Sequence, residues 1–443
     1  MKIVLPKFKF RGGVHPRYNK DRTSGSPVRR LPQQERLTVP LSMHLGTPAR
    51  PIVKPGDKIL KNQLIAEANG FLSVPVYAPE GGTVKAIAEA RTASGVVCQA
   101  IEISVDPAAE RINFPGIDWK SADPADLLKR IEDAGIAGMG GAGFPTKIKL
   151  APSKPVDTLI INGAECEPYL TSDHRLMVEK AEGIRIGIEI IRRILAIDKV
   201  RILIEDNKPD AIEAMRIAFD GIEGDVEIVK LKTVYPQGSE KQQIFSVTGR
   251  EVPSGALPMD VGCVVDNVGT AYAVFDAVVN GHPLTRRVVT VTGDAVAAPA
   301  NFIVPFGVSY RTLIEAAGGF AKPPAKIVSG GPMMGFTVAD LDLPVGKTSS
   351  GVTCLSADMV SQYSSSPCIS CGRCVDACPM RLIPSELSRL IEAEDVDGAR
   401  AANLMDCIEC GSCAYVCPAH RPLVHHYRRA KGVIRAAAQK GGR

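Results

Sequence analysis

Short apolar stretches separated by turns follow a polar opening segment. Between residues 37 and 110, runs such as Leu37–Pro40, Gln63–Ala66 and Gly82–Ile87 alternate with turns rich in Pro and Gly. Several short strands at this spacing predict a small all-β sandwich or barrel. Residues 1–36 have no clear period and are rich in Pro, Gly and Arg. We therefore expect a basic N-terminal arm that wraps over other parts of the protein.

Residues 118–284 alternate between amphipathic helical segments and short apolar runs. The expected strands are Thr158–Asn162, Val200–Ile204 and Val226–Leu231. The expected helices are Asp123–Ala134, Leu176–Ile197 and Pro209–Phe219. This alternation predicts a Rossmann-like parallel α/β sheet. Ligands of such sheets bind beyond the carboxyl ends of the strands, so the segment Asn162–Tyr169 is expected at a binding site.

The last third of the chain divides into two further units. Residues 285–340 read as strand, strand, helix and strand, which predicts a compact β-grasp-like domain. A Ser-rich linker, residues 361–366, lies at the start of a helical domain that we place at residues 355–430. Residues 431–443 form a basic tail. The predicted fold class is therefore multidomain α/β with a β barrel-sandwich module and a helical C-terminal domain.

Composition and charge limit the cellular location and the kind of partner expected for the chain. A chain of 443 residues that is 45% hydrophobic can fill several cores. No apolar run reaches the roughly 18 residues needed to cross a bilayer, and the opening residues lack the apolar core of a secretory signal. A cytoplasmic location is expected. Residues 1–37 carry ten basic and two acidic residues, and residues 419–443 carry seven basic and none acidic. Such ends suggest contact with an anionic partner or membrane surface, or alternatively solvated tails.

Eight of the twelve cysteines form two copies of the pattern C-x2-C-x2-C-x3-C-P, the second beginning at Cys407. Thiolates are soft ligands that suit four-iron–four-sulfur clusters, and in two-cluster ferredoxins the fourth cysteine of each motif binds the other cluster. We therefore assign one cluster to Cys368, Cys371, Cys374 and Cys417, and the other to Cys407, Cys410, Cys413 and Cys378. Zinc is the alternative, but it pairs cysteines across longer gaps. The other four cysteines are expected to be buried as small hydrophobic residues.

A Gly-rich loop, residues 138–149, follows the first predicted helix of the α/β domain. Its glycines let backbone N–H groups approach a phosphate, and Lys149 can neutralise one. Gly loops are also often only tight turns. The loop lacks the Gly-Lys-Ser/Thr ending of a P-loop, so ATP hydrolysis is not expected.

The loop sequence Gly-x-Gly-Gly-Ala-Gly-Phe-Pro-Thr resembles the FMN loop of the flavin-bearing subunit of respiratory complex I. Residues 162–168, 235–240 and 266–270 resemble three further motifs of that subunit, with Ala164 and Ser239 replacing acidic residues of the family. The resemblance implies that FMN is held by Gly138, Gly140, Gly141, Gly143, Lys149, Asn162, Asn267 and Thr270. It implies a nicotinamide nucleotide pocket lined by Phe144, Glu165, Glu167 and Glu240. Carboxylates suit ribose hydroxyls, so NADH is preferred over NADPH.

The order of the modules resembles that of the C subunits of Rnf ion-translocating electron-transport complexes, and residues 10–16 and 329–335 share the resemblance. The module at residues 37–110 resembles biotinyl and lipoyl domains, but its turn at residues 68–71 lacks their Lys, so we expect a scaffold. The Rnf resemblance implies a peripheral subunit on the cytoplasmic face of the inner membrane. It implies FMN, two [4Fe-4S] clusters and NADH as substrate, with other subunits as partners, ferredoxin as an indirect partner and no nucleic acid.

Two alternative functions remain open from the residues. A soluble cobalamin reductase shares the flavin, β-grasp and cluster modules. An electron-transfer or assembly protein would carry the Gly loop without flavin.

In the C-terminal tail, Leu423, Tyr427, Ala430 and Ile434 share one helical face among basic residues. This face is expected either to dock on a partner or membrane, or to cap the cluster domain.

Overall fold

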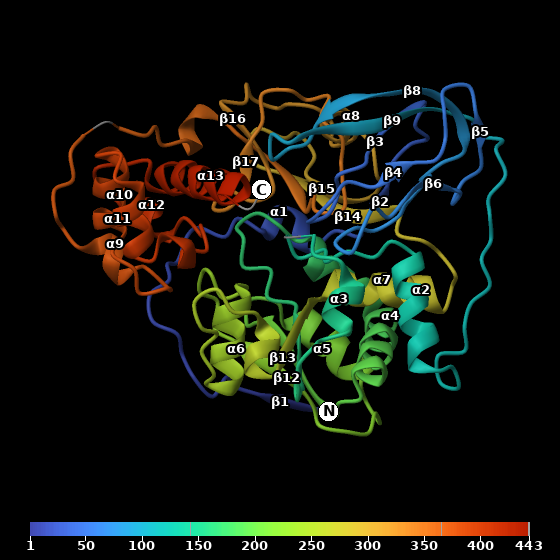
Figure 1. The fold of residues 1–443 in the computed structure, drawn as a ribbon, viewed down its shortest axis with the longest axis horizontal. Helices are drawn as coiled ribbons and strands as arrows, with labels where there is room; N and C mark the ends of the chain where they lie inside the picture. The colour runs from blue at the N-terminus through green and yellow to red at the C-terminus, as the bar shows by residue number, and fades with distance from the viewer. Residues whose placement is uncertain (142, 365, 442–443) are drawn as a thin grey trace.

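The chain folds into four β-sheets and a separate helical lobe, seen in a computed structural model that describes residues 1–141, 143–364 and 366–441 (Figure 1). Ala142 of the Gly loop, Ser365 of the Ser-rich linker and the last two residues of the tail lie outside the described residues. The α/β domain occupies the lower half of Figure 1, the barrel-sandwich and β-grasp-like domains lie above it, and the helical lobe lies at the left. The predicted multidomain α/β fold class is confirmed.

The barrel-sandwich module contains two small antiparallel sheets. The first has the order β3-β9-β8-β5 and the second β4-β6-β7. Their bounds are β3 Arg36–Pro40, β4 Arg50–Pro51, β5 Lys58–Ile59, β6 Leu64–Glu67, β7 Val76–Tyr77, β8 Gly82–Arg91 and β9 Val97–Val105. Alternating residues such as Leu37, Val39, Ile101 and Ile103 point into the core because side chains alternate across a strand. The strand β9 was not predicted from the sequence.

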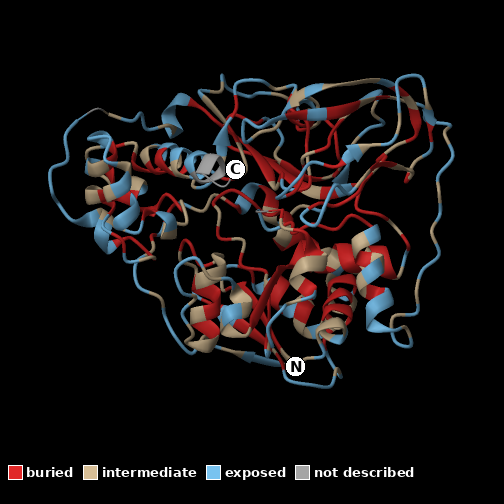
Figure 2. Cartoon of the chain, in the orientation of Figure 1, coloured by how far each residue is buried: buried red, intermediate tan, exposed pale blue. Residues whose placement is uncertain are grey.

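The α/β domain is built on a five-stranded parallel sheet of order β1-β12-β11-β10-β13. The strands are β1 Lys2–Val4, β10 Thr158–Asn162, β11 Lys199–Glu205, β12 Val226–Leu231 and β13 Cys263–Asn267. The helices are α2 Pro124–Asp133, α3 Thr146–Leu150, α4 Ser172–Leu195, α5 Pro209–Ala218, α6 Glu240–Thr248 and α7 Val268–Val278. Gly187 of α4 lets α7 approach closely, since a Cβ there would lie 1.8 Å from the Ala271 carbonyl oxygen. Figure 2 shows the buried residues concentrated in the strands and in the helices against them.

The β-grasp-like domain has a six-stranded sheet of order β17-β16-β18-β14-β15-β2. Its elements are β2 Arg29–Arg30, β14 Arg286–Thr292, β15 Ala300–Pro305, α8 Tyr310–Ala316, β16 Lys326–Ser329, β17 Phe336–Thr337 and β18 Gly351–Leu355. The buried strand β18 lies between β14 and β16. The sheet therefore continues past residue 340, where the sequence pattern placed its end, because pairing partners are not visible from local pattern alone.

The N-terminal arm is a structural strap rather than a free tail. Its β1 pairs with β12, and its β2 pairs with β15 of the β-grasp-like sheet. Between them the arm passes beside the helical lobe, where the Gly13 N–H donates to the Ala377 carbonyl at 3.0 Å, and forms the short helix α1 Asp21–Ser24 (Figure 1). Much of the basic N-terminal segment is thereby fixed along the body of the protein.

In the residues that the structure describes, the helical lobe has five α-helices around one small core. They are α9 Arg373–Asp376, α10 Pro384–Glu392, α11 Val396–Ala401, α12 Ser412–Tyr415 and α13 Leu423–Gly441. Leu423, Tyr427 and Ala430 of α13 are buried in this core, and Ile434 packs against it. Of the two expectations for the tail, the structure therefore shows the helix cap, and docking through this apolar face is wrong.

Candidate functional site: a Gly-rich loop and a cysteine-lined cavity

The Gly loop forms a closed turn between α2 and α3. The Gly138 N–H donates to the Phe144 carbonyl at 2.8 Å, and Ala137 bridges Pro145. Gly141 and Gly143 have φ of +132° and +64°, a region that disfavours other residues. A Cβ on Gly140 would lie 3.2 Å from the Asn267 Cβ, so a side chain there would press on β13. The loop is thus shaped by backbone freedom and close packing.

Asn267 and Thr270 contact this loop, and Asn162 lies beside Asn267. Asn162 and Asn267 end the adjacent parallel strands β10 and β13, so they lie side by side, and the Asn267 side chain caps α7 by accepting from Gly269 N at 2.8 Å. The Met139 N–H of the loop donates to Thr270 Oγ1 at 3.0 Å. Three segments distant in sequence therefore meet at the carboxyl edge of the sheet, where a ligand of such a sheet binds.

Lys149 and Asp266 give this edge its charge. Lys149 Nζ donates to the Val265 carbonyl at 2.8 Å and lies 3.8 Å from Glu240 Oε2. Asp266 is buried, and its two carboxylate oxygens have no hydrogen-bond partner among the described residues. Burial raises the pKa of Asp266 to about 6, opposed by Lys149. FMN offers a phosphate to an ammonium and backbone N–H groups, and hydroxyl donors to an unpaired carboxylate, so these residues fit the cofactor.

Glu165 and Glu167 are engaged in contacts within the protein. The Glu165 carboxylate accepts from the backbone N–H groups of Asp173 (2.8 Å) and His174 (3.1 Å), at the start of α4. The Glu167 carboxylate accepts from Met333 N at 3.2 Å and from Met334 N at 2.7 Å, and burial raises its pKa to about 7. Both carboxylates therefore already accept hydrogen bonds from backbone N–H groups of the protein.

The other two residues predicted for the nucleotide pocket lie differently. Phe144 is half-buried at the end of the Gly loop, and the Glu240 side chain is 42% exposed at the start of α6. Both therefore keep surface that a ligand can contact.

Two further residues border the flavin loop. Asp173 accepts from Asn267 Nδ2 at 2.7 Å, and burial beside Glu165 raises its pKa to about 7. Arg287, buried on β14, donates to the Met139 carbonyl at 3.3 Å. Asp173 closely follows the segment Asn162–Tyr169, which was expected at a binding site, so the sequence indicated its position. Arg287 belongs to another domain, and no pattern in the sequence connects it with the Gly loop.

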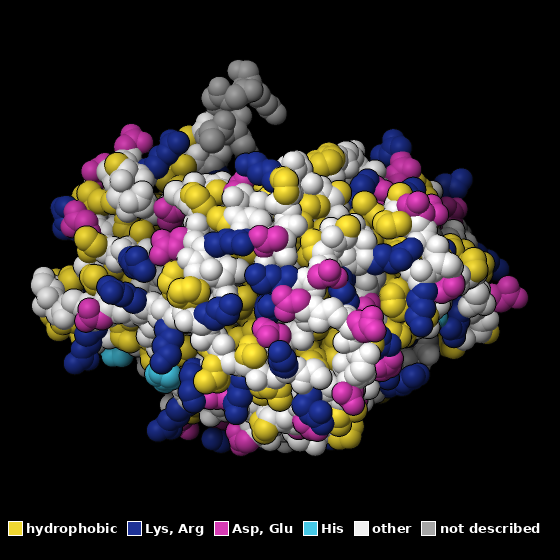
Figure 3. All heavy atoms as spheres, turned by 90° about the horizontal axis from the view of Figure 1, so that it is seen from below, with side chains coloured by type: hydrophobic (Ala, Val, Ile, Leu, Met, Phe, Trp, Pro, Cys, Tyr) yellow, Lys and Arg dark blue, Asp and Glu magenta, His cyan; other side chains and the backbone are white. Residues whose placement is uncertain are grey.

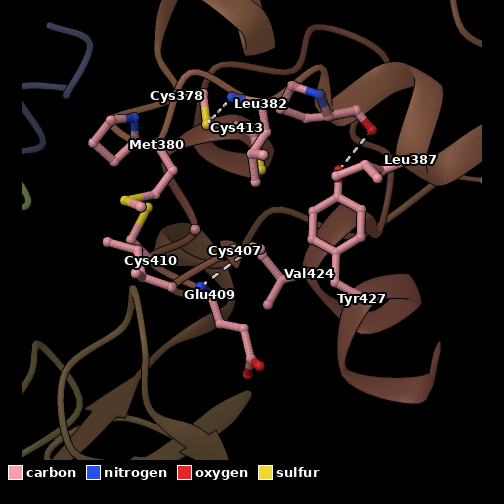
Figure 4. Close-up of a pocket in the computed structure, with 14 residues that line it drawn as sticks. Cys378, Met380, Leu382, Leu387, Cys407, Glu409, Cys410, Cys413, Val424 and Tyr427 are labelled. Carbon is pink, nitrogen blue, oxygen red and sulfur yellow. Dashed lines mark hydrogen bonds between the residues drawn. The ribbon is translucent and has the colours of Figure 1, made fainter. Parts of the chain in front are cut away.

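Four cysteines line one cavity in the helical lobe (Figure 4). Cys378 comes from the first motif, and Cys407, Cys410 and Cys413 come from the second, which is the set assigned to one cluster from sequence. The Glu409 N–H donates to Cys407 Sγ and the Leu382 N–H to Cys378 Sγ, each at 3.4 Å. Apolar side chains, among them Leu387, Val424 and Tyr427, complete the lining. Soft thiols with N–H donors in an apolar shell fit an iron–sulfur cluster.

The remaining motif cysteines lie toward solvent. Cys368 and Cys371 are exposed, Cys374 is half-buried, and Cys417 lines a surface recess with Gly13 and Arg373. The first motif repeats the backbone of the second: Ser370 and Glu409 have φ of 55° and 56°, and the Ser370 N–H donates to Cys368 Sγ at 3.4 Å. The thiols that line the cavity are thus buried or half-buried, whereas Cys368 and Cys371 of the first motif are exposed.

The cysteine cavity borders the α/β domain directly. The Tyr235 hydroxyl, which is fully buried, donates to the Cys410 carbonyl at 2.7 Å. Gln242 of α6 donates to the Pro379 carbonyl at 3.2 Å. Val14 of the arm pairs with Tyr235 through two backbone hydrogen bonds and packs in the same small apolar cluster. The loop that follows β12 therefore contacts the wall of the cluster cavity.

Two basic residues of α13 are paired with one acidic residue. Arg428 and Lys431 of α13 contact Glu409 at 3.1 and 3.0 Å. On the face shown in Figure 3, basic and acidic side chains are interspersed. In the part of the chain that the structure describes, no helix combines the length and apolar character of a membrane span.

Fold and site together define an iron–sulfur flavoprotein of the electron-transfer class. Four family models match: the RnfC barrel sandwich hybrid domain (residues 8–108), the Nuo51 FMN-binding domain (131–276), the SLBB domain (288–337) and the 4Fe-4S dicluster domain (361–418). The matches to an FMN-binding domain and a 4Fe-4S dicluster domain identify FMN and iron–sulfur clusters as the cofactors of the chain. They correspond in order to the four predicted modules.

Two C subunits of ion-translocating complexes extend this likeness over the whole chain. That of the proton-translocating ferredoxin:NAD(+) oxidoreductase complex of Clostridium ljungdahlii is 47% identical, over 97% of this chain and 95% of its own. That of the Na(+)-translocating ferredoxin:NAD(+) oxidoreductase complex of Acetobacterium woodii is 44% identical, over 98% of each chain. The chain belongs to the family of C subunits of Rnf-type ion-translocating oxidoreductase complexes.

A solved structure shares the fold at a lower level. The NAD+-reducing [NiFe]-hydrogenase in its H2-reduced state matches with a TM-score of 0.51 and 20% identity, over 74% of this chain and 69% of that one.

Proposed function

We propose that this chain passes electrons between NAD(H), FMN and two [4Fe-4S] clusters as one subunit of a membrane-bound ferredoxin:NAD(+) oxidoreductase complex that translocates ions. FMN, when bound, exchanges two electrons with the nicotinamide and single electrons with the clusters. The observation that carries the proposal is the direct contact between the flavin domain and the cluster cavity at Tyr235 and Cys410. Electron transfer needs such closeness, whereas separate storage or assembly sites do not.

The residues assigned from sequence take distinct parts in holding FMN. The backbone of Gly138, Gly140, Gly141 and Gly143, with Lys149, would hold the phosphate. Asn162, Asn267 and Thr270 would bind the rest of the cofactor at the carboxyl ends of β10 and β13, as their convergence there supports. Asp266, with two unpaired carboxylate oxygens, would accept from ribityl hydroxyls.

The nicotinamide nucleotide would enter beside the same loop. Phe144 and Glu240 keep exposed surface and would line its pocket. Glu165 and Glu167 would act differently from the direct contacts that the family resemblance implies. Glu165 would hold α4, and Glu167 would hold the turn at residues 331–335, so both would shape the pocket from behind.

The two clusters would follow one another outward. The cluster of Cys378, Cys407, Cys410 and Cys413 would receive electrons first, because its cavity borders the flavin domain. The cluster of Cys368, Cys371, Cys374 and Cys417 would pass them on, because two of its cysteines are exposed. A partner subunit of the complex would bind on this exposed side, and ferredoxin would communicate through it.

The proposed place of the chain is peripheral, on the cytoplasmic face of the membrane. Membership of the Rnf family supports a subunit of a membrane complex. Because the apolar face of α13 is covered by the cluster domain, contact with the membrane subunits would use other surfaces.

A reconstitution experiment tests the function. Protein loaded with clusters and FMN is mixed with NADH without oxygen, and the flavin and cluster absorbances are followed. The expected result is bleaching of the flavin together with both clusters. Failure to bind FMN would favour the flavin-free assembly protein. Reduction of an added cob(II)alamin at a rate matching cluster oxidation would favour the cobalamin reductase, an alternative that the relatives do not favour.

A further inference from the structure

Lys20 of the N-terminal arm is inserted beneath the loop that follows β10. Its ammonium donates to the carbonyl oxygens of Glu165 (2.8 Å), Glu167 (2.9 Å) and Leu170. Lys20 is buried, at 9% exposure, whereas the other lysines of the arm are exposed. A lysine ammonium has three N–H donors, so three carbonyls use all of them.

The loop, residues 164–170, needs such a partner because its backbone is turned inward. Glu165 and Tyr169 have φ of 46° and 70°, in the left-handed region that costs a non-glycine residue free energy. Lys208 holds the preceding carbonyl, of Ala164, at 2.6 Å, and Tyr169 N donates to the Tyr18 carbonyl at 2.6 Å. The carbonyls of a strained loop are thus gathered on two buried cations, one of them supplied by the arm.

The same loop connects the flavin site to its surroundings. It begins after Asn162, its Glu165 side chain holds the start of α4, and its Glu167 side chain holds the turn at residues 333–334. Movement of the loop would therefore disturb Asn162 and, through α4, Asp173 and its partner Asn267.

We propose that Lys20 is a positioning residue that fixes the 164–170 loop, so that the N-terminal arm completes the FMN site. The part of this proposal that concerns FMN rests on the proposed function. The part that concerns the loop stands on the contacts of Lys20 alone.

A change of pH offers a second test of the contact between Lys20 and the 164–170 loop. Burial lowers the pKa of Lys20 to about 8; Lys208 lowers it further, and Glu165, Glu205 and Cys166 oppose this. The carboxyl groups that act on Lys20 are those of Glu165 in the loop and Glu205 at the end of β11. A neutral amine has two N–H donors for three carbonyls. The loop should loosen as the pH rises through this value.

Two variants of the cluster-loaded protein test the proposal. Lys20→Met removes the ammonium and keeps the length of the side chain, and Lys9→Met is the matched control at an exposed position of the arm. Hydrogen exchange of residues 163–171 is measured without nucleotide, and FMN affinity is measured by quenching of flavin fluorescence. We expect Lys20→Met to speed exchange in this segment and to weaken FMN binding about tenfold, equivalent to about 1.4 kcal/mol. Lys9→Met should change neither.

The outcomes separate the two proposals. Unchanged exchange at residues 163–171 in a folded Lys20→Met protein overturns the role of Lys20. Faster exchange with no FMN binding even by the unaltered protein supports the role of Lys20 and overturns the proposed function. If Lys20→Met does not fold, the unaltered protein decides: its FMN affinity should fall between about pH 7.5 and 9.5, on either side of the Lys20 pKa of about 8, and a flat profile overturns the proposal.

Discussion

Replacing Cys378 in a background that lacks Cys407, Cys410 and Cys413 distinguishes two ways in which the cysteine motifs could divide between clusters. The cavity in Figure 4 takes one thiol from the first motif and three from the second. If each cluster borrows its fourth ligand from the other motif, Cys378→Ala damages the cluster of the second motif. If each motif is self-contained, the same change damages the cluster of the first motif. Single variants lose one cluster in either case, so they do not separate the two arrangements.

The magnitude follows from the ligand sets. Two four-iron clusters give about eight iron atoms per chain, and loss of one leaves about four with about half of the visible absorbance. A background in which Cys407, Cys410 and Cys413 are all Ser keeps only the cluster of the first motif, at about four iron atoms. Adding Cys417→Ala to this background should reduce the iron to near zero. Adding Cys378→Ala should leave it unchanged, because Cys378 points into the other cavity.

The assay is iron and acid-labile sulfide per chain after anaerobic reconstitution, with electron paramagnetic resonance of the reduced protein. Cys98→Ala, a buried cysteine of the barrel-sandwich module, is the matched control and should keep both clusters. The reverse result, in which Cys378→Ala empties the triple-Ser background and Cys417→Ala does not, would refute the crossed arrangement.

Three further changes probe the site. Tyr235→Phe removes the hydroxyl that donates to the buried Cys410 carbonyl at 2.7 Å. Leaving this carbonyl unpaired should lower the free energy of unfolding by about 1–3 kcal/mol. We expect faster loss of iron to a chelator, and an unchanged rate would show that this contact does not protect the cavity. Gly140→Ala should weaken FMN binding, since its Cβ would lie 3.2 Å from the Asn267 Cβ, whereas Gly25→Ala, with open space around it, should not; equal affinities would contradict this packing. Asp266→Asn should stabilise the flavin-free protein by about 3 kcal/mol at pH 7, because burial raises the pKa from 3.8 to about 6 and the folded state disfavours the carboxylate. This advantage should shrink in thermal unfolding as the pH falls from 7 toward 4, where unaltered Asp266 is protonated in the folded state, and a pH-independent difference would argue against a buried charge.

Local pattern predicted the α/β domain because its elements are long and regular. The strand Val226–Leu231 was predicted with the bounds of β12, and the segment after Asn162 was expected at the sheet edge where Asn267 also ends a strand. Both follow from periodicity and from the rule for parallel sheets. The meeting of the Gly loop with Thr270 needed the family resemblance as well.

Contacts between distant segments escaped prediction. The strands β1 and β2 have three and two residues, too few for any period, and they exist because β12 and β15 offer open edges. Nothing in the sequence indicated that the Glu165 and Glu167 carboxylates also accept hydrogen bonds from backbone N–H groups in the next helix and far along the chain. For α13, amphipathicity could not tell a covered face from an exposed one. Only the packing of Tyr427 decided it.

The strap formed by the arm has a consequence for how the protein is made. Residues 2–30 precede Ala377 and β15, with which they pair, by a long stretch of chain, so they are made well before these partners. Contacts of such long range form slowly, because the chain between them must first be ordered. Gly12 packs so closely on the Cys378 backbone that a Cβ there would lie 2.7 Å away. We therefore expect the arm to close beside the thiols of the cysteine cavity late in folding, so that iron and sulfide would enter most easily before it does. A chain whose arm docks early would be held in a compact, cluster-free form, so the timing of cluster delivery relative to translation would set the yield of active protein.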